Sequence, residues 1–136
     1  MKIFICCSKH FYDRVAIIKD RLEKLSHEIT LPNSNDEPFK EEEMRKLGEE
    51  EHRRWKAEMI GLQEVKVRQN DAVLVLNLKK NGQLNYIGGA TFLEIFKAWE
   101  LGKKIFLWNQ IPDNLFKDEL LGMNPCVIHG DVRKIN

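Results

Sequence analysis

The segment from Asn70 to Trp108 constrains the fold more than any other part of the chain. Its sequence is NDAVLVLNLKKNGQLNYIGGATFLEIFKAWELGKKIFLW, in which two strand-sized apolar runs flank a polar loop, a diglycine and a helical pattern. Strands that are apolar throughout are typical of a parallel sheet covered on both faces. In open α/β sheets, ligands bind in the crevice at the carboxyl ends of the strands, so this segment also predicts where a site lies.

The same alternation of strand and helix continues along the chain. We expect strands over 2–7, 28–31, 72–76, 104–108 and 126–129, and helices over 11–25, 41–68, 89–101 and 113–121. Gly48 and Gly61 are candidate breaks in the second helix. Alternating strands and helices imply a parallel sheet with right-handed crossovers. We therefore predict a single α/β domain over 1–136, with a doubly wound, Rossmann- or flavodoxin-like, mostly parallel five-stranded sheet of order 2-1-3-4-5.

Composition excludes several classes of protein. The 136 residues are 43% hydrophobic and 32% charged, which is typical of a globular chain. The formal net charge is +1, so no charge excess suggests nucleic acid or an anionic membrane as a partner. The apolar runs are far shorter than the roughly 20 residues of a membrane helix. We expect a cytoplasmic protein with no nucleic-acid and no membrane partner.

The cysteines and histidines show no metal-binding pattern. Cys6, Cys7 and Cys126 are odd in number and lack CxxC spacing, which argues against a disulfide framework and a zinc site. Free cysteine behaves as a small hydrophobe, so we expect the adjacent pair at the strand end to be buried. The four histidines are scattered. We expect neither a metal nor an organic cofactor.

Polar residues follow the strands whose ends border the predicted crevice. Ser8, Asn77 and Asn109 begin the loops that leave the first, third and fourth strands. Ser8, Lys9 and His10 together supply a hydroxyl, a cation and an imidazole, which suit a phosphate or a sugar hydroxyl. Helix capping by Ser8 or a neighbour explains the same residues equally well.

The diglycine and the acid after it form the second group of candidates. Gly88 and Gly89 let backbone approach a ligand, and amides at a helix start attract anions, although a tight turn explains a diglycine equally well. Glu94 shares a helical face with small residues that leave room for a ligand, Ala90, Thr91 and Ala98 among them. The alternative is an acid that only complements the helix dipole, worth about 0.3–1 kcal/mol. The opposing stripe is expected to fill the core: Phe92, Ile95, Phe96 and Trp99.

Other conspicuous residues have structural interpretations. Asp71 begins the third strand at the end opposite the crevice, and we expect it to be structural. We expect Arg53, Arg54 and Lys56 on a solvated helix face, and Trp55 in the core or at an interface rather than stacked on a ligand.

The run from Glu94 to Lys103 resembles the hallmark of the nucleoside 2-deoxyribosyltransferase superfamily, which includes the 2'-deoxynucleoside 5'-phosphate N-hydrolases. The hallmark is similar to G-x-G-x-E-L-G-x-A-x-x-x-G-K, and Glu94, Ala98, Gly102 and Lys103 are in register with it. The opening Ile-Phe-Ile-Cys-Cys-Ser is similar to the first strand and loop of that family. The resemblance spans the chain, and its motif lies within 70–108.

This resemblance implies an N-glycosidic bond cleaved with Glu94 as the nucleophile. A glycosyl-enzyme would form, and water would resolve it in a hydrolase or a second base in a transferase. Amides around Gly88, Gly89 and Ala90 would hold the 5'-phosphate or hydroxyl of a nucleoside or nucleotide. The family also implies a homodimer or larger homo-oligomer, with a neighbour's residue completing the site; the matching stretch lies around Asp118.

The chain departs from the family at the partner acid. That position is Gln63, with Glu64 beside it, and a glutamine cannot take or give a proton. Either Glu64 or another acid substitutes, or the activity differs. Phe96 also stands where the family has a glycine, Phe92 where it has a small residue and Ile95 where it has a leucine, and these changes narrow or reshape the pocket.

Three interpretations follow. The first is an N-glycosidase or deoxyribosyltransferase that depends on Glu94. The second, favoured by Gln63, is a nucleotide or nucleotide-sugar binding module without turnover. The third is an oligomeric structural protein, suggested only by Trp55 and Trp99 on helices.

Overall fold

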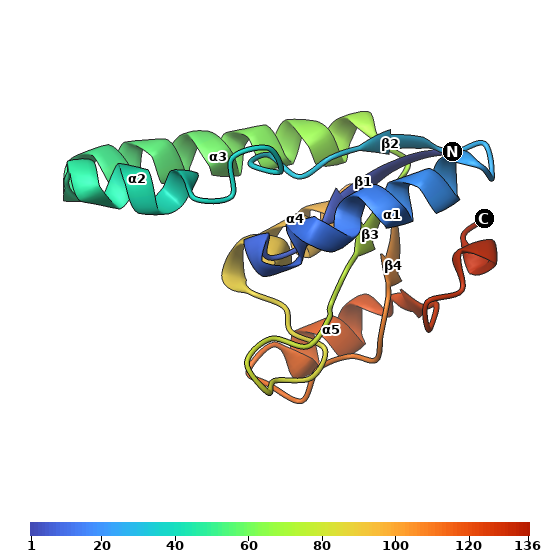
Figure 1. Ribbon diagram of the computed structural model, residues 1–136. Coiled ribbons are helices and arrows are strands. Elements are labelled where there is room, and N and C mark those ends of the chain that lie inside the picture. Colours follow the sequence, from blue (N-terminus) through green and yellow to red (C-terminus); the bar gives the residue numbers. More distant parts are fainter.

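The computed structural model describes residues 1–136 and is built on a five-stranded, all-parallel sheet (Figure 1). The strand order is β2-β1-β3-β4-β5, which confirms the predicted doubly wound α/β fold. The chain enters β3 beside β1, with Phe4 opposite Val73, and then continues outward to β4 and β5. The strands are β1 (Lys2–Cys6), β2 (Glu28–Thr30), β3 (Ala72–Val75), β4 (Lys104–Leu107) and β5 (Cys126–Val127).

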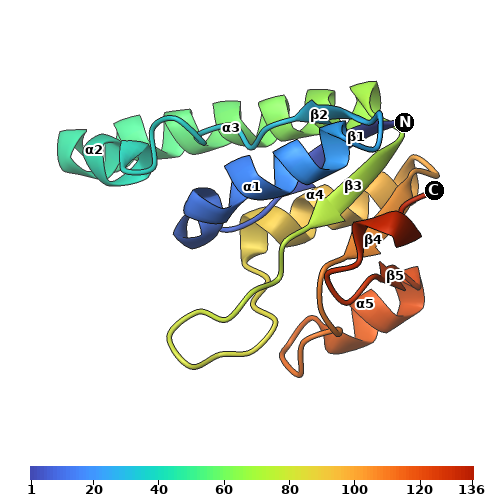
Figure 2. The same cartoon turned by 45° about the vertical axis from the view of Figure 1, so that its right-hand side comes forward.

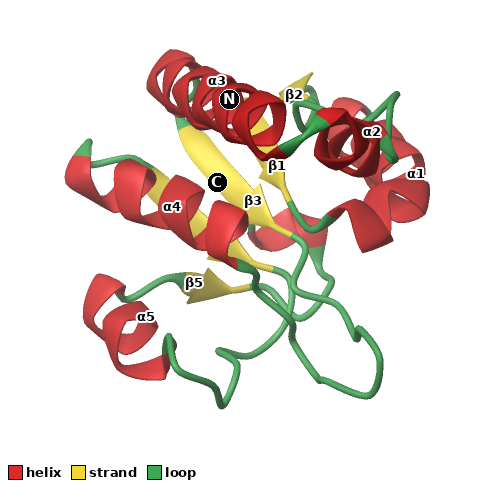
Figure 3. Cartoon of the chain, turned by 90° about the vertical axis from the view of Figure 1, so that its left-hand side faces the viewer, coloured by secondary structure: helices red, strands yellow, loops and turns green.

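Helices cover both faces of the sheet, as the apolar strands predict (Figures 2 and 3). On one face, Ile3, Ile5 and Leu74 of the strands pack with α1 and the short C-terminal η2. On the other face, Phe4 and Val73 pack with α3, α4 and α5. The helical elements are η1 (Lys9–Phe11), α1 (Tyr12–Glu23), α2 (Lys40–Leu47), α3 (Glu49–Gln69), α4 (Gly89–Glu100), α5 (Lys117–Met123) and η2 (Val132–Lys134).

Two predicted helix boundaries need correction. The single helix expected over 41–68 is two helices, because Gly48 has a φ of 126° that ends α2 and begins α3, whereas Gly61 lies within α3 without interrupting it. The last helix begins at Lys117 rather than 113. Before it, the Asn114 side chain accepts a hydrogen bond from the Phe116 amide at 2.9 Å, and this local turn competes with helix.

The α2–α3 hairpin extends past the edge of the sheet (Figures 1 and 2). The only buried residue of α3 is Val67 near its C-terminus, and α2 has no buried residue. Arg53 and Arg54 are exposed on this hairpin and pair with glutamates one turn earlier, as predicted for a solvated face. No helix of the chain has both the length and the apolar composition needed to cross a membrane.

Helix α4 presents a different face to the core from the one predicted. Ile95 is fully buried, but Phe96 and Trp99 are 41% and 51% exposed, so the expectation that they fill the core is wrong. The inward stripe instead runs through Thr91, Glu94, Ile95 and Ala98. The small Ala98 side chain, with no exposed surface, lets the helix lie close to the strands. Compared with the predicted orientation, α4 is turned about its axis so that Glu94 faces inward.

Candidate functional site

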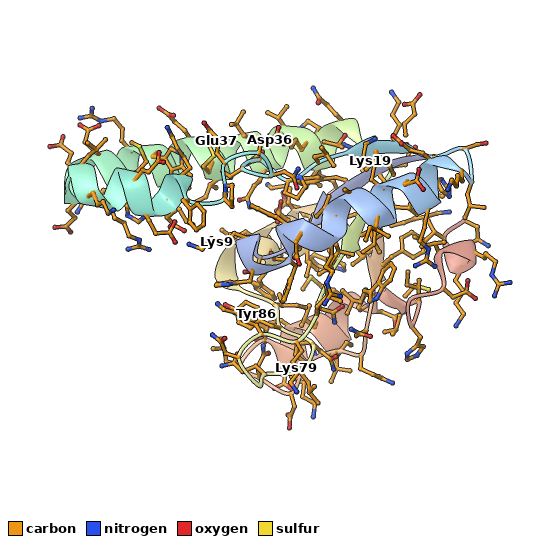
Figure 4. All side chains as sticks on the ribbon, in the orientation of Figure 1. Lys9, Lys19, Asp36, Glu37, Lys79 and Tyr86 are labelled. Atoms are coloured by element: carbon orange, nitrogen blue, oxygen red, sulfur yellow. The ribbon has the colours of Figure 1, made fainter.

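A cavity of about 270 Å³ opens at the carboxyl end of β1. Several segments line it, among them the start of η1, the loop before α2, one face of α3, the loop after β3 and the start of α4. In the view of Figure 4, Lys9 lies between Glu37 and Tyr86, and all three side chains line the cavity. The cavity therefore lies at the edge of the sheet where a doubly wound fold is predicted to have its crevice.

Glu94 lies on α4 at the inner wall of the cavity, with only 5% of its surface exposed. Burial raises the pKa of its carboxyl to about 8, because the charged form loses its hydration. Hydrogen bonding by the Cys6 thiol and the Gln63 amide, and the charge of Lys66, act in the opposite direction. The protein thus contains a carboxyl group that titrates near neutral pH inside a cavity, which is typical of acid, base or nucleophilic chemistry.

The N-terminus of α4 forms a second wall of the same cavity. Gly88 is the N-cap residue and no side chain caps the helix, so the amides of Gly89, Ala90 and Thr91 have no partner within it. All four residues line the cavity. A Cβ added at Gly89 would meet no atom within 4 Å, whereas one at Gly88 would lie 3.1 Å from the Tyr86 hydroxyl. Unpartnered amides at a helix start within a cavity suit an anion.

Positively charged side chains also lie around the cavity. The Lys80 ammonium lies 4.3 Å from the centre of the Tyr86 ring, and Lys9 pairs with Glu42. Partial desolvation, together with the charges of Lys80 and Lys9, lowers the pKa of His10. These residues all line the cavity except Glu42.

Ser8 has the capping role and also lies where the predicted binding role requires it. Its hydroxyl accepts a hydrogen bond from the His10 amide at 3.4 Å and caps η1. It also lines the cavity, together with Cys7. The adjacent Cys6 and Cys7 are buried, as predicted for small apolar residues at a strand end.

The structure separates the two candidates for a partner group on α3. Gln63 lines the cavity, and its Nε2 donates a hydrogen bond to the Ala90 carbonyl at 3.3 Å. Glu64 points elsewhere: it accepts a hydrogen bond from Arg68 Nε at 2.8 Å and does not line the cavity. Asp118 is an exposed residue of α5 and also lies outside the cavity. The glutamine, and not the neighbouring acid, is the α3 group beside Glu94.

Asn77 and Asn109 bind each other instead of lining the cavity. The Asn77 side chain donates to the carbonyls of Asn109 and Gln110 at 3.0 and 2.9 Å, and accepts from the Asn109 amide at 2.8 Å. The Asn109 side chain donates to the Asn77 carbonyl at 3.1 Å. These bonds join the loops after β3 and β4 and satisfy buried backbone groups, which is a structural role.

Sequence reasoning missed a polar cluster on the α2–α3 hairpin. Glu41 accepts hydrogen bonds from His52 Nε2 at 2.9 Å and Lys56 Nζ at 3.2 Å, and it pairs with Arg45. Burial raises the pKa of Glu41, but the His52 hydrogen bond and the Lys56 charge outweigh it and hold the pKa below its usual range. Glu41 and Lys56 line the cavity, so Lys56 does not lie simply on a solvated face.

Trp55 was expected in the core or at an interface, but it is half-buried, belongs to neither core cluster and lines the cavity. Tyr12 and Asn33, which the sequence argument did not single out, line the cavity from two other segments. No spacing signal connects them, because the fold of the hairpin over the sheet edge brings them together. Asp71, by contrast, accepts a hydrogen bond from the Lys2 amide at 2.8 Å, which confirms its predicted structural role.

Comparison with known proteins adds no family to this description. No protein-family model matches the chain. No curated protein matches its sequence either. No cluster of three or more histidine, cysteine, aspartate or glutamate side chains is arranged to hold a metal ion. The class that fold and cavity define is therefore a doubly wound α/β protein with a buried carboxyl in its crevice.

Proposed function

We propose that this protein cleaves or transfers at the N-glycosidic bond of a nucleoside or a nucleoside 5'-monophosphate. One observation carries the proposal: the buried Glu94 carboxyl shares a cavity with the uncapped N-terminus of α4. A nucleotide has the matching pair of features, an electrophilic anomeric carbon and an anionic phosphate. The register of Glu94, Ala98, Gly102 and Lys103 with the deoxyribosyltransferase hallmark supports the same assignment.

In the proposed reaction, Glu94 is the nucleophile. A carboxylate oxygen attacks the anomeric carbon, the bond from that carbon to the base nitrogen breaks, and its electron pair leaves with the base, which takes a proton from solvent. Water, or a second base in a transferase, then attacks the same carbon. This second attack breaks the glycosyl ester, returns the carboxylate, and releases the proton of the attacking group to solvent.

The remainder of the substrate is assigned to the walls of the cavity. We assign the 5'-phosphate or 5'-hydroxyl to the amides of Gly89, Ala90 and Thr91, because helix N-termini favour anions. Lys80, at the same opening, supplies a compensating charge. Asn77, Asn109, Glu64 and Asp118 take no part in this assignment, since none of them lines the cavity.

The pKa of Glu94 gives this mechanism a distinctive pH dependence. A nucleophile must be ionised, and the pKa of this carboxyl is about 8. For the free enzyme, kcat/KM is therefore expected to rise with pH and to level off above about 8. A rate that falls over the same range would instead make Glu94 a proton donor.

The direct test is base release from a panel of ribo- and deoxyribonucleosides and their 5'-monophosphates, followed by chromatography. Glu94→Gln keeps the shape and hydrogen-bonding capacity of the side chain but removes the nucleophile, so turnover is expected to fall by about a thousandfold or more. Glu100→Gln is the matched control, because it makes the same change on the exposed end of α4. Turnover by Glu94→Gln at the wild-type rate would overturn the proposal.

Gln63 favours a second function on the same scaffold, a nucleotide or nucleotide-sugar binding module without turnover. The position where the resemblance expects an acid holds an amide that donates to the Ala90 carbonyl. Tight nucleotide binding by calorimetry, with no base release on long incubation, would select this alternative. Absence of binding to any nucleoside, nucleotide or pentose phosphate would exclude both functions.

We also propose assembly into a homodimer or larger homo-oligomer. The outer face of α4 supports this, since Leu93, Phe96 and Trp99 are 44%, 41% and 51% exposed at helical spacing. Sedimentation velocity decides the point. A monomer at micromolar concentration would contradict the proposal, and would also count against a purely structural oligomeric protein.

A further inference from the structure

The hydrogen bonds of Gln63 determine which way its amide group faces. Its nitrogen donates to the Ala90 carbonyl at 3.3 Å, and a carbonyl oxygen can only accept. The contact with the Glu94 carboxyl also favours the charged form of that group, which again requires a donor. Both neighbours therefore need the Nε2 end of the amide, and a flipped amide would place oxygen against oxygen.

The carbonyl end of the same amide is an acceptor without a partner in the chain. Gln63 Oε1 makes no hydrogen bond with any other residue, and it is not among the buried atoms that lack a partner. It is therefore open to solvent, and Gln63 is a lining residue of the cavity. Gln63 thus brings an unpartnered acceptor to the cavity wall, on the same amide whose nitrogen contacts the Glu94 carboxyl.

We infer that Gln63 is a specificity-determining residue, which accepts a hydrogen bond from the 2'-hydroxyl of the substrate and makes the protein selective for ribosides over 2'-deoxyribosides. The inference rests on the proposed function, which brings an anomeric carbon to Glu94. The sugar carbon that bears the 2'-hydroxyl is bonded to that anomeric carbon, so its hydroxyl lies next to the attacking group. In glycoside cleavage, hydrogen bonds to this hydroxyl strengthen in the transition state.

An amide suits this role better than an acid would. Gln63 holds its oxygen as an acceptor whatever the pH, and it adds no second negative charge beside Glu94. Because the side chain is only half-buried, water can replace a missing hydroxyl. The expected selectivity is therefore about tenfold, the value of one ordinary hydrogen bond, and not the far larger factor of a fully desolvated site.

The experiment compares a riboside 5'-monophosphate with its 2'-deoxy counterpart on the wild type and on Gln63→Met. Methionine keeps the length of the side chain but removes the acceptor. A 2'-hydroxyl changes the intrinsic reactivity of the glycosidic bond, so the measured quantity is the riboside-to-deoxyriboside ratio of kcat/KM, compared between the two proteins. This comparison cancels the intrinsic term, as a double-mutant cycle does.

The ratio is expected to fall about tenfold in Gln63→Met and to stay unchanged in Gln69→Met, the same substitution at an exposed position of α3. Gln63→Glu retains an acceptor and is expected to keep the preference for ribosides. On the wild type alone, a 2'-fluoro analogue, which has no hydrogen to donate, is expected to bind about tenfold more weakly than the riboside.

An unchanged ratio in folded Gln63→Met, or equal wild-type affinity for riboside and 2'-fluoro analogue, would overturn this inference and leave the proposed function standing. If base is not released, calorimetry gives the riboside-to-deoxyriboside ratio of dissociation constants for the wild type and Gln63→Met. An unchanged ratio would then overturn the inference in the same way. If the wild type neither binds nor cleaves any member of the pair, the proposed function fails, and the inference fails with it.

Discussion

At the scale of the residue, Glu94 is the feature on which the proposed chemistry depends. Its side chain lies on the inward face of α4, is only 5% exposed, and lines the cavity. Three neighbours, Cys6, Gln63 and Lys66, favour the charged form, but desolvation outweighs them and the pKa rises to about 8. The position therefore costs folding free energy whenever the group is ionised, which is the expected trade of stability for function at a site.

This cost predicts how stability depends on pH. The usual pKa of glutamate is near 4.5 and that of folded Glu94 is about 8, so between these values the native state holds one proton more than the unfolded state. The contribution of Glu94 to the free energy of unfolding is therefore most favourable below about pH 4.5. It is lost as the pH rises toward 8, by about 1.4 kcal/mol per pH unit.

Removing the titrating group should reverse this loss. Glu94→Gln is expected to be more stable than the wild type at pH 8 by roughly 4 kcal/mol, and by much less at pH 5. Urea unfolding at both pH values measures the difference, with Glu100→Gln as the exposed control. A gain that is equal at pH 5 and pH 8 would contradict the assignment.

At the scale of the element, two glycines of the α2–α3 hairpin have opposite roles. Gly48 joins the helices with a φ of 126° and a ψ of 164°, a conformation that essentially only glycine adopts. Gly61 lies inside α3 in helical geometry, and a Cβ there would meet no atom within 4 Å. From the sequence, both glycines are candidate helix breaks. Only the backbone conformation shows that Gly48 ends a helix and Gly61 does not.

The two alanine substitutions are therefore expected to have opposite signs. Gly48→Ala should destabilise the protein by about 1–3 kcal/mol, because alanine is strained at this φ and ψ. Gly61→Ala should stabilise it by up to about 1 kcal/mol through helix propensity. Urea unfolding of both variants tests the prediction, and two changes of the same sign would refute it.

At the scale of the whole molecule, the cavity lies between two parts with different packing. The sheet and its covering helices contain both clusters of buried apolar side chains, whereas α2 has no buried residue. Polar contacts hold α2 in place: Glu42 pairs with Lys9, and Glu41 accepts from His52 and Lys56. One wall of the cavity is therefore less firmly packed than the other.

Hydrogen exchange is expected to show this difference. In the free protein, amides of α2 should exchange well before those of β1 and β3, because few buried contacts oppose local opening of α2. A bound nucleoside 5'-monophosphate should slow exchange in 32–47, and leave β5 nearly unchanged as an internal control. Exchange of α2 as slow as that of β3 in the free protein would contradict this description. Mass-spectrometric exchange resolves these segments.

Much of the fold follows from the sequence because its signals are local. Apolar strand-sized runs, helical spacing and short connections predict the five strands and their order, and the structure confirms them. Glu94 and the diglycine also lie in one continuous segment, so sequence reasoning placed them together and the cavity contains both. The start of the last helix was missed because a side-chain turn at Asn114 competes with helical periodicity.

Only the tertiary structure decided which neighbouring side chains reach the cavity. Gln63 and Glu64 are adjacent on α3, and a rotation of about 100° per residue sends one to Glu94 and the other to Arg68. Asn77 and Asn109 satisfy each other, and Glu41 reaches the site only because a glycine turn folds α2 along α3. The sequence by itself determined the sheet, its helices and the acid, since these depend on local pattern. The composition of the cavity depends on how helices rotate and pack, which no local pattern encodes.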